Sequence, residues 1–245
     1  MSLSNPTVSA NPASKFIHFK GDVGKWFYWD KQKEENIEVP LPISFIILDE
    51  LSTIKGWSEV HKSNIYSNEI HHLNETLTVR TFKGGAMIKG WYAEIKNDIK
   101  AIGGKYVKSI YAMVYDENGD TDLVNFQLSG AAFSAYLDVK IKPNNQAVGI
   151  MEETEKAKKG SVEYLMPVFK PLEMDEGLRQ QAIEMDIELQ EYLKSYKVMK
   201  ENEVVEKAEV SENDTLSPGE MEEEFKQKDE KDPDYKKEDE NDLPF

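Results

Sequence analysis

Apolar and polar residues alternate along much of the first two thirds of the chain, and this period of two predicts a β-rich body. Strands are expected at residues 25–30, 37–48, 65–72, 76–82, 106–115 and 123–128, with a loop at 49–59. The pattern then changes to helical spacing at four apolar residues: Trp91, Ile95, Ile99 and Ile102. Because Gly103 and Gly104 follow, we expect an amphipathic helix of about 12 residues that ends at this glycine pair.

The later segments complete an order that an OB fold accommodates. The run Asp116–Asp120 is a hairpin signal, so three or four strands are followed by a helix and a hairpin. A short helix is expected at 131–139, a second hairpin at 147–155 and 162–169, and a helix of about 24 residues at 178–199. We therefore expect a mainly β protein with helices, in which residues 15–142 form an OB-like β-barrel. Residues 143–200 would pack on the barrel or extend it; a coiled coil that joins copies of the chain in a homo-oligomer is the alternative.

Negative charge is concentrated near the C-terminal end. The formal net charge of the chain is -16, and residues 201–245 account for most of it, with 18 acidic residues against six lysines. Such a segment has too little apolar surface to offset its ordering entropy, so we expect a disordered acidic tail. Residues 1–14 are rich in Ser, Asn and Pro and are expected to form a disordered leader. Because the charge is segregated, an acidic composition does not exclude a nucleic-acid-binding body.

Few signs of catalysis, metal binding or membrane insertion are present. The chain has no cysteine, which excludes disulfides and thiolate zinc sites, and no apolar run approaches the roughly 20 residues of a membrane span. His71 and His72 lie near Glu69 and Glu75 but complete no metal-binding frame, and no glycine run forms a phosphate-binding loop. We expect no metal, cofactor or enzyme activity. The acid pair Asp49 and Glu50 leaves a metal-dependent nuclease as a weaker alternative.

The acidic run ends in Asp242, Leu243, Pro244 and Phe245, and this ending resembles the C-terminus of single-stranded-DNA-binding proteins. The body is similar, less specifically, to phage-encoded members of that family. The resemblance implies an OB fold and sequence-nonspecific binding of single-stranded DNA in replication, recombination or repair. It also implies a tail that competes with DNA for a basic groove, and a tip that recruits replication or recombination proteins. The implied compartment is the cytoplasm of a bacterial host cell.

Two regions combine basic and aromatic residues in the way that single-strand binding requires. In the first, alternation places Trp26 and Tyr28 on one face of a strand, and Phe27 and Trp29 on the other. The strand is either a stacking platform or sandwiched between the barrel and the C-terminal helix. The second region, residues 80–111, holds seven cations against two acidic residues; an ordinary solvated surface is its alternative reading. The residues expected to bind DNA are Lys20, Lys25, Trp26, Tyr28, Trp29, Arg80, Lys83, Lys89, Trp91, Lys105, Tyr106, Lys108 and Tyr111.

A different class of function remains open. The chain could be an adaptor that copies the tip of a host single-stranded-DNA-binding protein and touches no DNA. Absence of an exposed basic and aromatic groove on the body would favour this adaptor. The sequence does not distinguish DNA from RNA, because stacking and phosphate contacts serve both.

Overall fold

The structure is a computed structural model that describes residues 11–82, 85–116, 118–139 and 146–210, with residues 197–210 as backbone alone. The chain divides into two compact units, Met1–Ser195 and Tyr196–Phe245, and the architecture below belongs to the first. Within the described residues, no helix combines the length and the apolarity needed to cross a bilayer.

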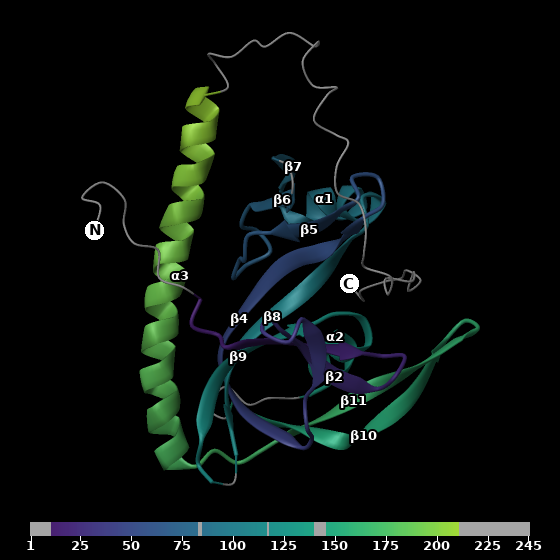
Figure 1. Ribbon diagram of the computed structural model, residues 1–245, viewed down its shortest axis with the longest axis vertical. Coiled ribbons are helices and arrows are strands. Elements are labelled where there is room, and N and C mark those ends of the chain that lie inside the picture. Colours follow the sequence, from purple (N-terminus) through teal and green to yellow (C-terminus); the bar gives the residue numbers. More distant parts are fainter. Residues whose placement is uncertain (1–10, 83–84, 117, 140–145, 211–245) are drawn as a thin grey trace. The chain divides into compact units, whose positions relative to one another are not determined.

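A single sheet dominates the first unit (Figure 1). Its strands run in the order β3-β2-β1-β9-β8-β4-β5-β6-β7, and β10 pairs with both β4 and β11. Neighbouring strands are antiparallel except β1 and β9, which are parallel. The strands are β1 (Lys15–Lys20), β2 (Lys25–Asp30), β3 (Glu35–Glu38), β4 (Ile43–Ser58), β5 (Ser63–Ser67), β6 (Leu77–Thr81), β7 (Ala86–Gly90), β8 (Gly104–Tyr115), β9 (Thr121–Leu128), β10 (Ala147–Lys159) and β11 (Val162–Pro171).

Strand β4 organises this sheet. It is 16 residues long and pairs with β8 along its length, with β10 near its start and with β5 near its end. The register shifts between Ile47 and Asp49, which marks a β-bulge or irregularity in the middle of the strand. The expectation of a loop at 49–59 is therefore wrong for all but the last residue of that range. The polar pair Asp49 and Glu50 interrupts the apolar pattern without ending the strand, because both carboxylates find partners from other elements.

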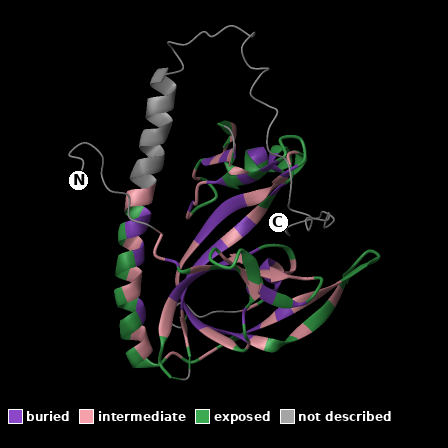
Figure 2. Cartoon of the chain, viewed as in Figure 1, coloured by how far each residue is buried: buried purple, intermediate pink, exposed green. Residues whose placement is uncertain are grey.

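The core lies between the sheet and its helices, and Figure 2 shows buried residues concentrated on β4, β8 and β9. One part is aromatic: the ring centroids of Phe45 and Phe126 lie 4.7 Å apart, and Trp26 meets Phe126 edge-on at 5.9 Å. A second part is aliphatic and is covered by α1 (Tyr92–Ala101), which buries Ile95 and Ile99 against β4, β5 and β6. Such packing supplies most of the stability of a helix of this length.

The helices agree with the expected periodicity. Helix α1 ends before Gly103, whose φ of 88° favours glycine, and a Cβ there would lie 2.2 Å from the Trp57 carbonyl oxygen. Helix α2 (Gly130–Leu137) confirms the short helix expected at 131–139. Helix α3 (Glu176–Val210) is 35 residues long, so the expected helix of about 24 residues was too short. Its buried residues Leu189 and Leu193 identify the face that packs within the first unit.

The mainly β fold with helices is confirmed, as are both hairpins, β8–β9 and β10–β11. Strands β1 and β7 were not expected, and each has only five or six residues. The single strand expected at 37–48 is divided into the short β3 and the start of β4. The strand pairing ends at β3, β7 and β11, so the described pairing does not close a barrel. The N–H of Leu165 in β11 nevertheless donates to the carbonyl of Gly21 at 2.9 Å, which brings β11 to the β1–β2 turn.

Candidate nucleic-acid interface

One face of the sheet gathers cations and aromatic rings, beginning with β1 and β2. In β1, Phe16, His18 and Lys20 alternate with the buried Ile17, so they lie on the face opposite to the aromatic core. The register pairs His18 with Phe27, and their ring centroids are 6.4 Å apart. Trp29 follows Phe27 by two residues and shares its face.

Strands β4, β5 and β6 continue the same face. The register places Lys55 opposite Tyr66, and Tyr66 opposite Arg80, so the three side chains form a cross-strand row. Phe82 extends this row, because its N–H donates to the Asn64 carbonyl at 3.0 Å and prolongs the β5–β6 pairing. We call this surface the cationic–aromatic face; its residues are Phe16, His18, Lys20, Phe27, Trp29, Lys55, Tyr66, Arg80 and Phe82.

Lys55 joins the two halves of the cationic–aromatic face. Strands β8 and β9 lie between β4 and β1, and three strand spacings in a flat sheet would be about 14 Å. The Lys55 ammonium nevertheless lies 5.6 Å from the centroid of the Phe16 ring. The sheet therefore curves between β4 and β1, and the contact between Lys55 and Phe16 joins the two groups of residues.

The electrostatics of the cationic–aromatic face favour an anion. Burial lowers the pKa of His18, and the nearby charges of Lys20 and Lys55 lower it further. Burial likewise lowers the pKa of Lys55, although the carboxylate of Glu69 acts in the opposite direction. Lys20 lies over the Phe27 ring at 5.1 Å. Among the described residues, no carboxylate is within ion-pair distance of Lys20 or Lys55, so a bound anion would relieve the repulsion between these groups.

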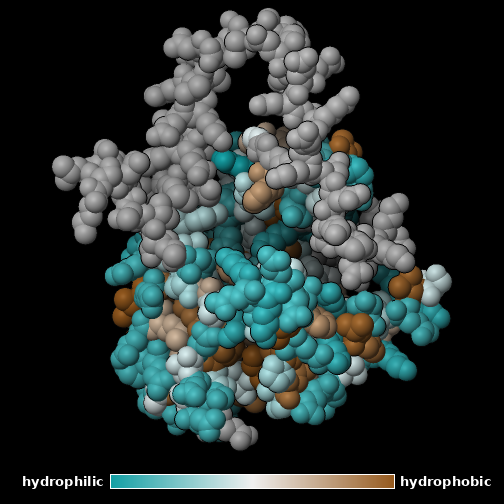
Figure 3. Space-filling view, viewed as in Figure 1, coloured by the Kyte–Doolittle hydropathy of each residue, from teal (hydrophilic) through white to brown (hydrophobic). Residues whose placement is uncertain are grey.

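Exposed aromatic rings are the second property of this face. Trp29 is 54% exposed and Phe82 is 78% exposed, whereas a large apolar side chain is normally buried. Phe16 and Tyr66 are 40% and 38% exposed. The hydropathy view in Figure 3 shows, on the side it displays, separate hydrophobic patches divided by hydrophilic side chains. Rings that are exposed singly between cations suit stacking on bases better than the burial of one broad apolar partner.

The structure brings several of the predicted residues to the cationic–aromatic face and leaves others elsewhere. Lys20, Trp29 and Arg80 belong to it. Two exposed lysines lie at its margins: in the strand register, Lys89 is opposite Thr78 and Lys105 is opposite Lys55. Lys25 forms an exposed ion pair with Glu38 at 2.8 Å. Trp91 is 52% exposed, but it lies at the start of α1. Lys83 and the tip residues Asp242, Leu243, Pro244 and Phe245 lie outside the described residues.

Four predicted stacking or phosphate-binding residues are corrected by their burial or partners. Trp26 is 1% exposed and Tyr111 is fully buried, so a base cannot reach either ring in this structure. Tyr106 lies between the rings of Tyr92 and Phe133, at 5.2 and 5.4 Å, on the core side of β8. Lys108 is on the same side, with its ammonium 3.0 Å from Glu50. Tyr28 shares the face of Trp26, as the alternation predicted, and lies under the Lys15 ammonium.

Tyr111 has a structural role instead. Its hydroxyl donates to Glu69 at 2.9 Å and accepts from the Asn11 amide at 3.1 Å. The second Glu69 oxygen accepts from Ser109 at 2.6 Å. Burial raises the pKa of Tyr111, and the Glu69 carboxylate raises it further, so the phenol stays protonated and donates. This network holds the Glu69 carboxylate, whose charge acts to raise the pKa of Lys55.

Sequence reasoning missed five residues of the cationic–aromatic face and set a sixth, Phe27, aside. The pattern Phe-x-His-x-Lys at 16–20 has the period of a strand and could have revealed two of them, Phe16 and His18. Lys55 was missed because its segment was assigned to a loop. The missed residues are Phe16, His18, Lys55, Tyr66 and Phe82.

The structure brings one acidic candidate to a histidine and separates the two acidic residues. Asp49 accepts from His71 at 2.9 Å and from Gln190 at 3.0 Å, whereas Glu50 contacts Lys108 and Tyr136 on the opposite side of β4. The described residues include no group of three or more acidic or histidine side chains that could hold a metal ion.

Comparisons with known proteins add no relative. No protein-family model matches the chain, and no curated protein or solved structure matches it. We therefore infer the function from the geometry of the cationic–aromatic face.

Proposed function

We propose that this protein binds single-stranded DNA without sequence specificity and without catalysis, through the cationic–aromatic face. The observation that carries the proposal is the row of exposed rings interleaved with cations on one side of the sheet, from Trp29 to Phe82. Each ring can stack on any base, and each cation can contact a phosphate. Such contacts serve replication, recombination or repair, where strands of every sequence must be bound. The presence of this face on the body is the reason we prefer DNA binding to the adaptor.

The order of the elements supports an OB-like assignment, which we propose for β4 to β9. The order β4-β5-β6-α1-β8-β9 follows the OB order of three strands, a helix and two strands, once the short β7 is set aside. In that assignment β5 and β6 are the second and third strands, whose face binds oligonucleotides in OB folds. Tyr66 and Arg80 lie on these two strands.

The acidic tail and its tip stay a proposal from the sequence. We propose that the tail competes with DNA for the cationic–aromatic face and that residues 242–245 recruit a replication or recombination protein. The charge of the tail supports the first part, because an anionic segment and a phosphate backbone are attracted by the same cations.

Loss of an exposed ring should weaken binding according to its position. Trp29→Ala is expected to weaken binding of labelled oligo-dT by roughly tenfold, because stacking contributes about 1–3 kcal/mol per base. The salt dependence should not change, since no charge is removed. The matched control is Trp91→Ala, which removes an equally exposed tryptophan outside the face. Equal losses from both variants in fluorescence anisotropy would contradict the proposed surface.

Binding should also strengthen as the pH falls. In the free protein, burial, Lys20 and Lys55 lower the pKa of His18, whereas a phosphate beside it would raise that pKa. The complex therefore takes up a proton, and affinity rises as pH falls through the bound-state pKa and levels off below the free-state pKa. We expect a gain of about threefold to tenfold between pH 8 and pH 5.5. In the His18→Gln variant the affinity for oligo-dT should hardly change with pH. A pH dependence equal to that of the unmodified protein would show that His18 is not the group that takes up the proton.

A further inference from the structure

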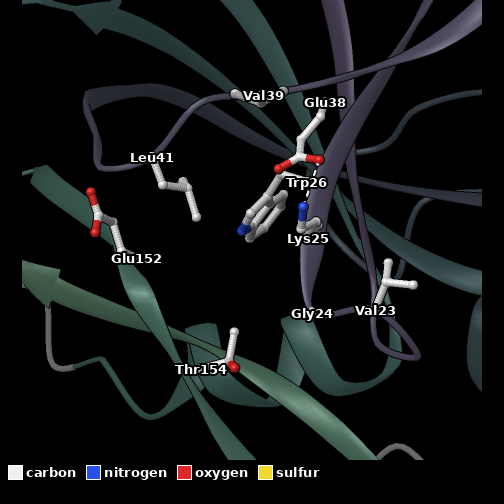
Figure 4. Close-up of a pocket in the computed structure, with 9 residues that line it drawn as sticks. All are labelled: Val23, Gly24, Lys25, Trp26, Glu38, Val39, Leu41, Glu152 and Thr154. Atoms are coloured by element: carbon white, nitrogen blue, oxygen red, sulfur yellow. Dashed lines mark hydrogen bonds and ion pairs between the residues drawn. The ribbon is translucent and has the colours of Figure 1, made fainter.

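Two hollows border the β10–β11 hairpin, and they differ in what can enter them. The first lies where the β2–β3 hairpin approaches β10 and has a volume of about 250 Å³ (Figure 4). Trp26 lines it but is 1% exposed, so its unpartnered Nε1 is out of reach. The lysine of this hollow, Lys25, is paired with Glu38 at 2.8 Å. A ligand here would therefore reach neither the indole N–H nor an unpaired cation.

The second hollow lies between the end of α2 and the base of the β10–β11 hairpin, and its volume is about 380 Å³. Most of the residues that line it are apolar, and two exposed carboxylates come from Asp138 and Glu155. Among the described residues that line it, none is a cation. The hollow therefore suits an apolar group that is accompanied by a positive charge. We call it the acidic groove; its main residues are Asp138, Val139, Glu155, Met166, Val168 and Phe169.

One face of the hairpin carries the acidic groove at its base and a cation beside an apolar side chain at its tip. Residues that are directly opposed in the register, or two apart on one strand, share a face of the sheet. At the tip, Lys159 is exposed and Val162 is 51% exposed. Three opposed pairs follow one another along this face from base to tip: Glu155 with Met166, Ala157 with Tyr164, and Lys159 with Val162.

The other face of the hairpin packs against the β1–β2 turn. A Cβ on Gly24 would lie 2.5 Å from Cδ1 of Leu165 and 3.4 Å from Cγ2 of Thr154, so these side chains already fill the space beside the turn. Toward its tip the hairpin extends away from the sheet (Figure 1), and its residues there are mostly exposed (Figure 2). The face that carries the acidic groove is therefore open along the outer half of the hairpin.

Charge is segregated along this open face, with carboxylates at the base and a lysine at the tip. Two hairpins that lie face to face and antiparallel would place the tip of each over the acidic groove of the other. We propose that a second copy of this chain occupies the acidic groove, with Lys159 beside Glu155 of the partner copy and Val162 against its Met166. The same contact is made twice, so the arrangement is isologous and closes as a dimer.

The symmetry of this dimer fixes one further contact. Ala157 lies midway between Glu155 and Lys159 along β10, so the two-fold axis brings it opposite the same residue of the partner copy. The shared face is small, and small interfaces belong to weak, reversible complexes. The opposed charges should make the association weaker as salt rises.

Reversal of charge tests the pairing in the absence of DNA. Sedimentation velocity of the full chain, at low salt and at concentrations up to several hundred micromolar, should show a reversible dimer. The groove variant, Asp138→Lys with Glu155→Lys, should dimerise at least about tenfold more weakly, because it places like charges together. The tip variant, Lys158→Glu with Lys159→Glu, should lose as much. An equimolar mixture of the two variants should recover the dimer, since the groove of each is complementary to the tip of the other.

A matched control separates this contact from an effect of net charge. The pair Lys96→Glu and Lys100→Glu, on α1, makes the same change of charge as the tip variant but lies outside the hairpin. It should dimerise within about threefold of the unmodified protein, because exposed charges beyond the Debye length are largely screened.

A cross-link locates the two-fold axis. The chain has no cysteine, so Ala157→Cys introduces a single thiol at the expected axis. A short bismaleimide should link two copies of this variant, since packed sheets lie about 10 Å apart. The control Ala93→Cys, on the exposed side of α1, should stay unlinked.

Several results would overturn the proposal. These are a monomer at every concentration, a dimer that neither reversal weakens, and no cross-link at residue 157. A dimer that survives both reversals would assign the association to another surface of the chain. A tip variant that loses oligo-dT binding, when the unmodified protein forms no dimer, would assign the tip to DNA. Because the association is measured without DNA, its failure would leave the proposed DNA-binding function standing.

Discussion

Replacing Lys20, Lys55 and Arg80 together by Gln is expected to weaken oligo-dT binding by roughly 100-fold at low salt. These three side chains carry the positive charge along the cationic–aromatic face, from β1 across β4 to β6. The slope of log affinity against log salt should also become shallower by about two, since each phosphate contact on a single strand contributes about 0.7. Fluorescence anisotropy over a series of salt concentrations measures both quantities.

A matched variant carries the same change of net charge away from this face. Lys96 and Lys100 lie on α1, which covers the opposite side of the sheet, and Lys158 lies on the β10–β11 hairpin. Their joint replacement by Gln should change affinity by less than about threefold, because exposed charges farther away than the Debye length are largely screened. If this control loses as much affinity as the first variant, binding follows net charge and no particular face.

Removal of residues 211–245 is expected to tighten oligo-dT binding by about tenfold at low salt. This segment holds 14 acidic residues and five lysines, and its removal leaves α3 intact. The gain should shrink as salt rises, because salt screens the attraction between the tail and the cations of the face.

A second variant distinguishes the effect of the negative charge of the tail from the effect of its length. A variant that keeps all 35 residues of 211–245, but carries Asn and Gln in place of each Asp and Glu, should bind as tightly as the truncated chain. Affinity equal to that of the intact protein in both variants would refute competition between tail and DNA.

Local signals predicted much of the fold. The helix at α1 and its glycine stop could be read from apolar spacing, and the β8–β9 hairpin from its turn residues. The helix and the hairpin are both determined by residues close together in the sequence. The loop predicted at 49–59 failed because the polar residues Asp49 and Glu50 are satisfied by His71 and Lys108, which lie far away in sequence. No local pattern shows that a carboxylate in a strand will meet such a partner.

The site was predictable only in part for the same reason. Alternation showed that Trp26 and Trp29 lie on opposite faces of β2, but not which face is core. That choice depends on Phe126 and Phe169, which come from β9 and β11 and enclose the Trp26 ring. The residues of the basic segment 80–111 likewise lie on both faces of the sheet. Arg80 and Lys105 lie on or beside the cationic–aromatic face, whereas Tyr106 and Lys108 point to the core side.

The most direct test of the central claim is an anisotropy titration of labelled oligo-dT, with a duplex of equal length as the control, at low and moderate salt. It should be made with the intact protein and with the chain lacking residues 211–245. We predict preferential, salt-sensitive binding of the single strand by both proteins. No binding by either protein, or equal affinity for the duplex, would contradict the assignment of the cationic–aromatic face to single-stranded DNA.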